Sequence, residues 1–255
     1  MKTIDKAVSL LDQFSERSNT LGVTDLARAT GLDKSVVHGL LRSLAHNGLI
    51  EQVPEGRKYR LGAKMLSYGH VRAASMPVIE CARGVVRELR DQAGESAQLS
   101  VFLGDEMQVV VAFESDQPAR VGFRVGRALS LHCSAVGLAV LSALPADFVD
   151  DLLSKPLKRL EGRPDMLMDP KRVRMLVEEA RARGVAYADR TFTSDVTGVG
   201  APVFGAGGEP IAAVAVSAPA HRVDRERMEQ FGALARAAAA RISAAMGYAG
   251  TERAA

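Results

Sequence analysis

Residues 24–61 limit the possible folds more than any other part of this 255-residue chain. An apolar series in this stretch has the i, i+3, i+4, i+7 spacing of one helix face: Val37, Leu40, Leu41 and Leu44. Asp33 is placed to cap this helix at its start, and Gly48 is placed to end it. A shorter helical segment upstream is interrupted at Gly31, and the spacing of the two segments predicts a helix-turn-helix.

The opposite face of the second helix is free of large apolar side chains. At about 100° per residue, this face carries Ser35, Gly39, Arg42 and His46. Gly39 would allow the helix to approach another surface closely. The face therefore suits contact with a polar partner.

Two short strands are predicted after this helix, at residues 49–53 and 58–61, around a turn at residues 54–57. Arg57, Lys58 and Arg60 gather at this tip. A helix-turn-helix followed by a basic hairpin is typical of a winged DNA-binding domain, in which Lys and Arg contact phosphates and the second helix contacts bases. A helical hairpin with glycine in its turn also occurs in many other proteins, so the basic wing strengthens the prediction.

Composition sets further bounds. Apolar residues make up 47% of the chain and charged residues 25%, which is typical of a globular protein. No apolar run approaches the roughly 20 residues that span a bilayer, and residues 1–5 do not resemble a secretion signal, so a cytoplasmic protein without a membrane segment is expected. Cys81 and Cys133 lie far apart, and the five histidines have no metal-ligand spacing, so no disulfide, metal site or cofactor is predicted.

The patterning predicts three regions: a winged helix-turn-helix at residues 1–62, a linker helix at 63–76, and a mixed α/β domain at 77–250. An amphipathic helix at residues 4–14 is expected to cover the first core. In the third region, strands are expected at residues 97–103, 107–113, 120–125, 128–131, 185–191, 198–204 and 211–217. Helices are expected there at residues 78–93, 134–144, 147–153, 171–183 and 224–246. Residues 156–170 are predicted to be a loop, and residues 251–255 a frayed end.

Taken together, these features resemble the IclR family of transcriptional regulators over nearly the whole chain. The resemblance rests on the order and spacing of six segments: residues 4–14, 31–38, 58–62, 131–137, 198–204 and 215–219. It implies an α/β (α+β) protein with a winged helix-turn-helix, a linker helix and a GAF-like domain that binds a small effector. It also implies homodimers or homotetramers that bind a pseudo-palindromic operator, as two-fold symmetry requires.

The expected DNA contacts lie on the second helix and the wing: Lys34, Ser35, Val36, His38, Gly39, Arg42, Arg57, Lys58 and Tyr59. The family often has Thr or Ser at Val36 and Arg at Gly39. Valine can touch a thymine methyl but cannot donate a hydrogen bond to a base, so Ser35, His38 and Arg42 are expected to read the sequence. His38 flanks the apolar face and could instead be a packing residue.

The resemblance also implies an effector pocket. The matching positions are Ala135, Val136, Ala188 or Asp189 (depending on a shift of one residue), Gly198, Ala215 and Ser217. Most of these side chains are apolar or very small, and so few donors would satisfy a two- or three-carbon keto acid poorly. A bulkier organic acid, such as an aromatic acid from a catabolic pathway, is therefore predicted, with Arg120 or Arg124 as counter-charge. Ala188 and Ala215 could equally be core residues.

The sequence favours a ligand-responsive regulator of a catabolic operon over two other classes of protein. An enzyme with an accessory winged helix, such as a biotin-ligase-type repressor, would need a Gly/Arg-rich adenylate loop, which the sequence lacks. His132 and Cys133 are adjacent, which does not place a base on a nucleophile. The chain is therefore predicted not to be an enzyme, although a reactive thiol at Cys133 stays open. A purely architectural DNA binder would not need the third region.

Overall fold

The computed structural model describes residues 2–15, 18–54, 56–159 and 166–250. The chain forms two compact units, Met1–Met76 and Pro77–Ala255. Three predicted features reach beyond the described residues: the tip of the hairpin at residue 55, part of the loop at 160–165 and the chain end at 251–255.

The first unit contains the predicted helix-turn-helix. Its helices are α1 (Thr3–Leu11), α2 (Val23–Thr30), α3 (Lys34–His46) and α4 (Ala63–Ala74). A left-handed backbone at Gly31 (φ 69°) ends α2, and extended Asp33 precedes α3, so two residue types in the turn set the break between the helices. Leu10, Leu26, Val37, Leu41, Leu44 and Ile50 form the buried core.

The wing is part of a small antiparallel sheet. Strands β1 (Leu21–Gly22), β2 (Ile50–Gln52) and β3 (Lys58–Leu61) have the order β1-β3-β2. The strand β1 was not predicted, because two residues carry no periodic pattern. Helix α1 ends at Leu11 rather than at residue 14, yet Phe14 still packs against the core.

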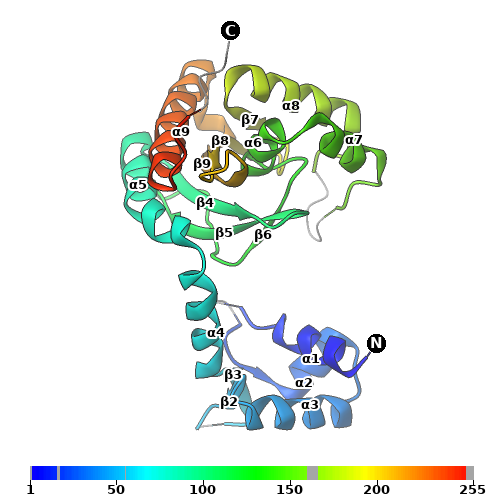
Figure 1. Cartoon of the computed structure of the whole chain (residues 1–255). Coiled ribbons are helices and arrows are strands. Elements are labelled where there is room, and N and C mark those ends of the chain that lie inside the picture. Colours follow the sequence, from blue (N-terminus) through cyan, green and yellow to red (C-terminus); the bar gives the residue numbers. More distant parts are fainter. Residues whose placement is uncertain (1, 16–17, 55, 160–165, 251–255) are drawn as a thin grey trace. The chain divides into compact units, whose positions relative to one another are not determined.

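The second unit is a six-stranded antiparallel sheet with helices on both faces, which confirms the predicted mixed α/β class. The strands are β4 (Ser96–Phe102), β5 (Glu106–Phe113), β6 (Ala128–Ser130), β7 (Ala186–Asp189), β8 (Val196–Phe204) and β9 (Pro210–Pro219), in the order β6-β5-β4-β9-β8-β7. Helices α5 (Pro77–Ala93) and α9 (Arg225–Ala245) lie against one face. Helices α6 (Ala135–Ala143), α7 (Ala146–Ser154) and α8 (Pro170–Arg183) lie on the other side (Figure 1).

One predicted strand is wrong. Residues 120–125 have no regular structure, and β6 pairs with β5 rather than with them. The segment follows Pro118 and contains Gly122, and both residue types are unfavourable within a strand. It rejoins the sheet at Gly126, whose amide donates to the Val109 carbonyl oxygen. The apolar residues of this segment therefore belong to a loop over the sheet.

Candidate functional site

The outer face of α3 is the first candidate site. Lys34, Ser35, His38, Gly39 and Arg42 are exposed and Val36 is half-buried, while the apolar face of the same helix packs into the core. The exposure of His38 argues against its role as a packing residue. The structure thus presents the six predicted helix residues on the surface, within two and a half turns of one helix.

Gly39 is not required by the packing of this chain. A Cβ atom built at Gly39 would meet no heavy atom within 4 Å. Glycine in a helix interior destabilises it by about 0.5–1 kcal/mol relative to alanine. The described part of the chain therefore shows no packing reason for glycine at this position.

The wing presents two of its three predicted contacts. Arg57 and Lys58 are exposed. Tyr59 is half-buried and packs against the apolar core of the first unit, so its contact with DNA stays a prediction. Arg60 makes an ion pair of 2.6 Å with Glu51 on the neighbouring strand, so its charge is locally compensated.

The second candidate site is a cavity of about 520 Å³ on the α6 side of the large sheet. Its size lies within the range of small-molecule sites. The wall comes from the start of α6, from the 118–127 segment, and from the loop between β7 and β8. The lining residues are Gln98, Pro118, Ala119, Arg120, Val121, Gly122, Phe123, Arg127, Leu129, Ser134, Ala135, Ala188, Phe192, Thr193, Asp195, Val196, Gly198, Ser217, Pro219 and His221.

Strand register explains why there is space above the sheet. Directly opposed residues of antiparallel strands point to the same face. One row across the sheet therefore contains Ser96, Ser217, Gly198 and Ala188, and the next contains Ala112, Gln98, Ala215, Gly200 and Ala186. Gln98 is the one large side chain among these nine residues.

Two glycines allow α6 to pack closely, one against this floor and one against the segment that precedes the helix. A Cβ at Gly200 would lie 2.7 Å from the carbonyl oxygen of Ala135, and one at Gly137 would lie 2.4 Å from that of Ser130. Ser134 caps α6: its hydroxyl accepts from the Gly137 amide at 3.1 Å and donates to the Ser130 carbonyl oxygen at 2.6 Å. The start of α6 is thus fixed as one wall of the cavity.

Cationic side chains lie around the cavity. Arg120 pairs with Glu114 at 2.8 Å, and Arg127 stacks over the Phe192 ring at 5.6 Å. His221 and the anionic Asp195 are also part of the lining. Arg124, the other predicted counter-charge, is exposed and does not line the cavity. The charged wall therefore contains two arginines, one histidine and one carboxylate.

A buried ion pair holds the 118–127 wall in place. The Arg222 guanidinium donates two hydrogen bonds of 2.9 Å to Glu95 and one of 2.8 Å to the carbonyl oxygen of Ala119. The Glu95 side chain is buried, so the loss of its partner would leave an uncompensated charge. This pair links the end of β9 to the cavity wall.

Four of the seven predicted effector positions line the cavity: Ala135, Ala188, Gly198 and Ser217. Val136 and Ala215 are fully buried and lie outside its lining, as core residues. Asp189 was the alternative to Ala188 under a shift of one residue. It points to the opposite face of β7 and does not line this cavity. Arg120, a predicted counter-charge, also lines the cavity, whereas the sequence did not indicate Gln98, Thr193 or the rest of residues 118–123, which no motif marks.

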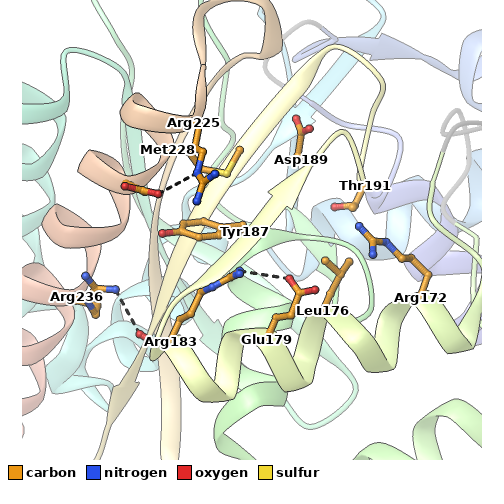
Figure 2. A pocket seen from close by; sticks show the side chains of 11 residues that line it. Arg172, Leu176, Glu179, Arg183, Tyr187, Asp189, Thr191, Arg225, Met228 and Arg236 are labelled. Carbon is orange, nitrogen blue, oxygen red and sulfur yellow. Dashed lines mark hydrogen bonds and ion pairs between the residues drawn. The ribbon is translucent and has the colours of Figure 1, made fainter.

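Asp189 faces a separate groove between α8 and α9. Figure 2 shows Tyr187 at its centre, between Arg225 of α9 and Arg183 of α8. Its charges are largely paired within the chain: Arg183 with Glu179 at 3.3 Å, Arg225 with Glu229 at 3.3 Å and Asp189 with Arg190 at 3.5 Å. Most charged side chains of this groove are therefore neutralised by neighbours in the chain and do not need a charged ligand.

Cys133 is buried beside the cavity wall, and burial raises the pKa of its thiol to about 11. The thiol stays protonated near neutral pH, which makes it a weak nucleophile. Neighbouring His132 is held by Ser130 Oγ, 2.7 Å from its Nδ1, and burial lowers the pKa of this histidine. Within the described ranges, no cluster of His, Cys, Asp or Glu could hold a metal ion, and no helix is long and apolar enough to cross a membrane.

Comparison with known families covers both units. A model described as the IclR helix-turn-helix domain matches residues 3–54, and one described as the bacterial transcriptional regulator IclR C-terminal domain matches residues 70–244. The HTH-type transcriptional regulator XynR of Escherichia coli (strain K12) is 29% identical over 97% of this chain and 98% of its own length. The HTH-type transcriptional regulator BhcR of Paracoccus denitrificans (strain Pd 1222) is 30% identical, over 89% and 81%.

Solved structures share the fold. An IclR transcriptional regulator from Silicibacter sp. TM1040 has a TM-score of 0.77 and 31% identity, and the match covers 98% of each chain. An IclR homologue from Microbacterium hydrocarbonoxydans, crystallised with 4-hydroxybenzoate, has a TM-score of 0.79 and 22% identity over 96% of this chain and 99% of its own. The second similarity is one of fold alone.

Proposed function

The chain belongs to the IclR family of bacterial transcriptional regulators, and from that premise we propose that it controls a catabolic operon in response to a small organic acid. It contains the helix-turn-helix domain and the effector domain of the family. The observation that carries the proposal is that each unit has a surface suited to its part: the polar outer face of α3 and the cavity above the large sheet.

In this proposal α3 enters the major groove of the operator. Ser35, His38 and Arg42 contact base edges, Val36 contacts a thymine methyl, and Gly39 permits close approach. Lys34, Arg57 and Lys58 contact phosphates, which position the domain without specifying sequence. The exposure of all eight residues, Val36 in part, supports this assignment.

The effector in this proposal is an organic acid larger than a three-carbon keto acid. Its carboxylate lies near Arg120, Arg127 or His221, and its apolar part lies against Ala135, Ala188 and Gly198. The ligand bound in the structure of the Microbacterium homologue, 4-hydroxybenzoate, is an acid of this kind and supports an aromatic effector. No cofactor takes part.

The active form in this proposal is a homodimer or homotetramer on a pseudo-palindromic operator. Exposed apolar side chains on two helices of the first unit support it: Ile4 on α1 is 76% exposed, and Leu66 and Val71 on α4 are 79% and 69% exposed. A second copy would remove such side chains from water. Two-fold symmetry of the protein would then match two half-sites on the DNA.

The switch follows from differential affinity. A ligand shifts an equilibrium only as far as it binds one state better than the other. In this proposal the acid favours one arrangement of the 118–127 and 190–195 loops, and α4 acts as the linker that passes the change to the spacing of two winged helices. The protein acts in the bacterial cytoplasm, where its operator lies.

The proposal assigns no catalytic activity to the chain. The raised pKa of Cys133 disfavours a thiol nucleophile, and both matching family models describe regulators. Turnover of a bound acid by the purified protein would contradict this assignment and favour an enzyme that carries a DNA-binding domain.

The test combines two measurements on the purified full-length protein. A thermal-shift screen against aromatic and aliphatic acids reports the effector, because a ligand that binds only the native state raises the melting temperature. Gel shifts with upstream DNA report the operator. Arg42→Ala should weaken operator binding by about 1–3 kcal/mol and leave the thermal response to the acid unchanged.

Arg172→Ala is the matched control, because it removes an exposed arginine from α8 in the second unit. It should leave operator binding intact. Equal loss in both variants would point to a general charge effect rather than to reading by α3. If only two- and three-carbon keto acids raise the melting temperature, the proposal of a ligand-responsive regulator stands and the predicted class of effector is wrong.

A further inference from the structure

The cavity wall contains buried polar atoms that the protein leaves unpaired. Gln98 is 4% exposed and Thr193 is 9% exposed, and both line the cavity. Within the part of the chain that the structure describes, Gln98 Oε1 and Thr193 Oγ1 have no hydrogen-bond partner. Buried polar groups in native proteins are nearly always paired, so these two atoms at the cavity wall are placed to pair with whatever occupies the cavity.

The surroundings of Gln98 single it out. Its cross-strand neighbours are Ala112 on β5 and Ala215 on β9, and Gly200 lies beyond Ala215 in the same row. None of these side chains can form a hydrogen bond with the amide. The long side chain of Gln98 is therefore the one polar group that this row of the sheet offers to a ligand.

The chemistry of an amide limits what this ligand can present. The amide oxygen accepts a hydrogen bond and the amide nitrogen donates one, and a half-turn of the group exchanges them. A hydroxyl group both donates and accepts, so it satisfies Gln98 in either orientation. A methylene or an aromatic C–H satisfies neither.

We propose that Gln98 is a specificity-determining residue that selects an effector with a hydroxyl group, so that the inducing acid is a hydroxylated acid rather than its deoxy counterpart. This inference rests on the proposed function, because it assumes that the cavity is the effector site. Gln98 would distinguish a hydroxylated acid from its deoxy counterpart, which the size and charge of the cavity do not do.

The test uses pairs of acids that differ by one hydroxyl: 4-hydroxybenzoate and benzoate, 3-hydroxybenzoate and benzoate, phenyllactate and phenylpropionate, and lactate and propionate. Calorimetry on the full-length protein gives the ratio of dissociation constants within each pair. In the wild-type protein the best ligand should be hydroxylated, with its deoxy partner bound about tenfold more weakly or worse, because a buried acceptor left unpaired penalises the wrong ligand.

Gln98→Met keeps the length of the side chain and removes its hydrogen-bonding groups. This variant should reduce the ratio to about threefold or less without weakening the deoxy acid. Ser100→Ala is the matched control. Ser100 lies two residues along the same face of β4, and its buried hydroxyl also lacks a partner, but it does not line the cavity. For Ser100→Ala, the ratio of dissociation constants within each pair of acids should equal that of the wild-type protein.

Ligand-free stability gives an independent readout. Gln98→Met should melt no lower than the wild-type protein, because the amide oxygen that it removes accepts no hydrogen bond from the described residues. A marked fall in melting temperature would show that Gln98 is a structural residue and would overturn the inference.

The remaining outcomes separate the inference from the function on which it rests. Acids that bind equally well with and without the hydroxyl, or a ratio that Ser100→Ala changes as much as Gln98→Met does, would overturn the role of Gln98 and keep the acid sensor. Binding by no acid of the panel would remove the proposed effector class, and the inference with it.

Discussion

Helices α3 and α6 carry the two candidate sites in opposite ways. Helix α3 buries one face and exposes the other, so its functional groups are side chains that project from a convex surface. Helix α6 is buried from Ala135 to Ser142, and its site is the space that small residues leave between the helix and the sheet. A surface site therefore depends on which side chains project from it. A cavity depends on side chains that are small enough to leave space.

Glycines within helices also differ between the exposed and the buried site, and alanine substitutions can test this difference. Gly39, Gly84 and Gly137 all lie within helices. A Cβ would meet nothing within 4 Å at Gly39 or Gly84, but it would clash with Ser130 and Leu131 at Gly137. The same substitution should therefore have opposite effects on stability at Gly39 and at Gly137.

The largest effect is expected for Gly137→Ala. A methyl group within 2.5 Å of the Leu131 backbone would force α6 away from the sheet, at a cost of roughly 3 kcal/mol in the free energy of unfolding. Urea unfolding of the purified variant, with Gly84→Ala as control, measures this loss. Stability equal to that of the control would show that the wall of the cavity is not rigid, and the comparison between the two helices would fail.

Gly39→Ala should change stability in the other direction. Alanine is the better helix residue, so the free energy of unfolding of the first unit should rise by about 0.5–1 kcal/mol. If α3 approaches DNA closely, the added methyl group should weaken operator binding by roughly tenfold. Gly84→Ala should match the gain in stability and leave DNA binding unchanged. A Gly39→Ala variant that binds operator as well as the wild-type protein would remove the close-approach argument.

The smallest effect concerns acid sensitivity, which should be confined to the second unit. Burial lowers the pKa of His132 in the folded protein, so the unfolded chain binds a proton more readily. The contribution of His132 to stability is therefore complete above its ordinary pKa near 6.5 and is lost as the pH falls below that value. Melting curves at pH 7.5 and 5.5 should show a smaller fall for His132→Gln than for the wild-type protein, and an equal fall would contradict this source of acid sensitivity.

The sequence alone predicted most of the first unit. Apolar spacing in α3, the glycine at residue 31 and the basic cluster at the wing act between residues close in sequence, so local patterns encode them. The exposed face of α3 follows directly, because burying one face of a helix exposes the other. The half-buried position of Tyr59 did not follow from these patterns, because an aromatic side chain on β3, the central strand of its sheet, can face either side.

The cavity depended on tertiary structure. Apart from the strand wrongly predicted at residues 120–125, the order of helices and strands in this unit was readable from periodicity. The sequence gives no register, however, and a shift of one residue moves a side chain to the other face of a sheet. That is why Ala188 lines the cavity and Asp189 faces the groove beside α9. Gln98 joins residues that are about 20 to 120 positions away along the chain, and its unpaired amide becomes visible only once β4, β5 and β9 are aligned. Helix periodicity fixes a face locally, whereas a cavity exists only when distant segments meet and leave room between them.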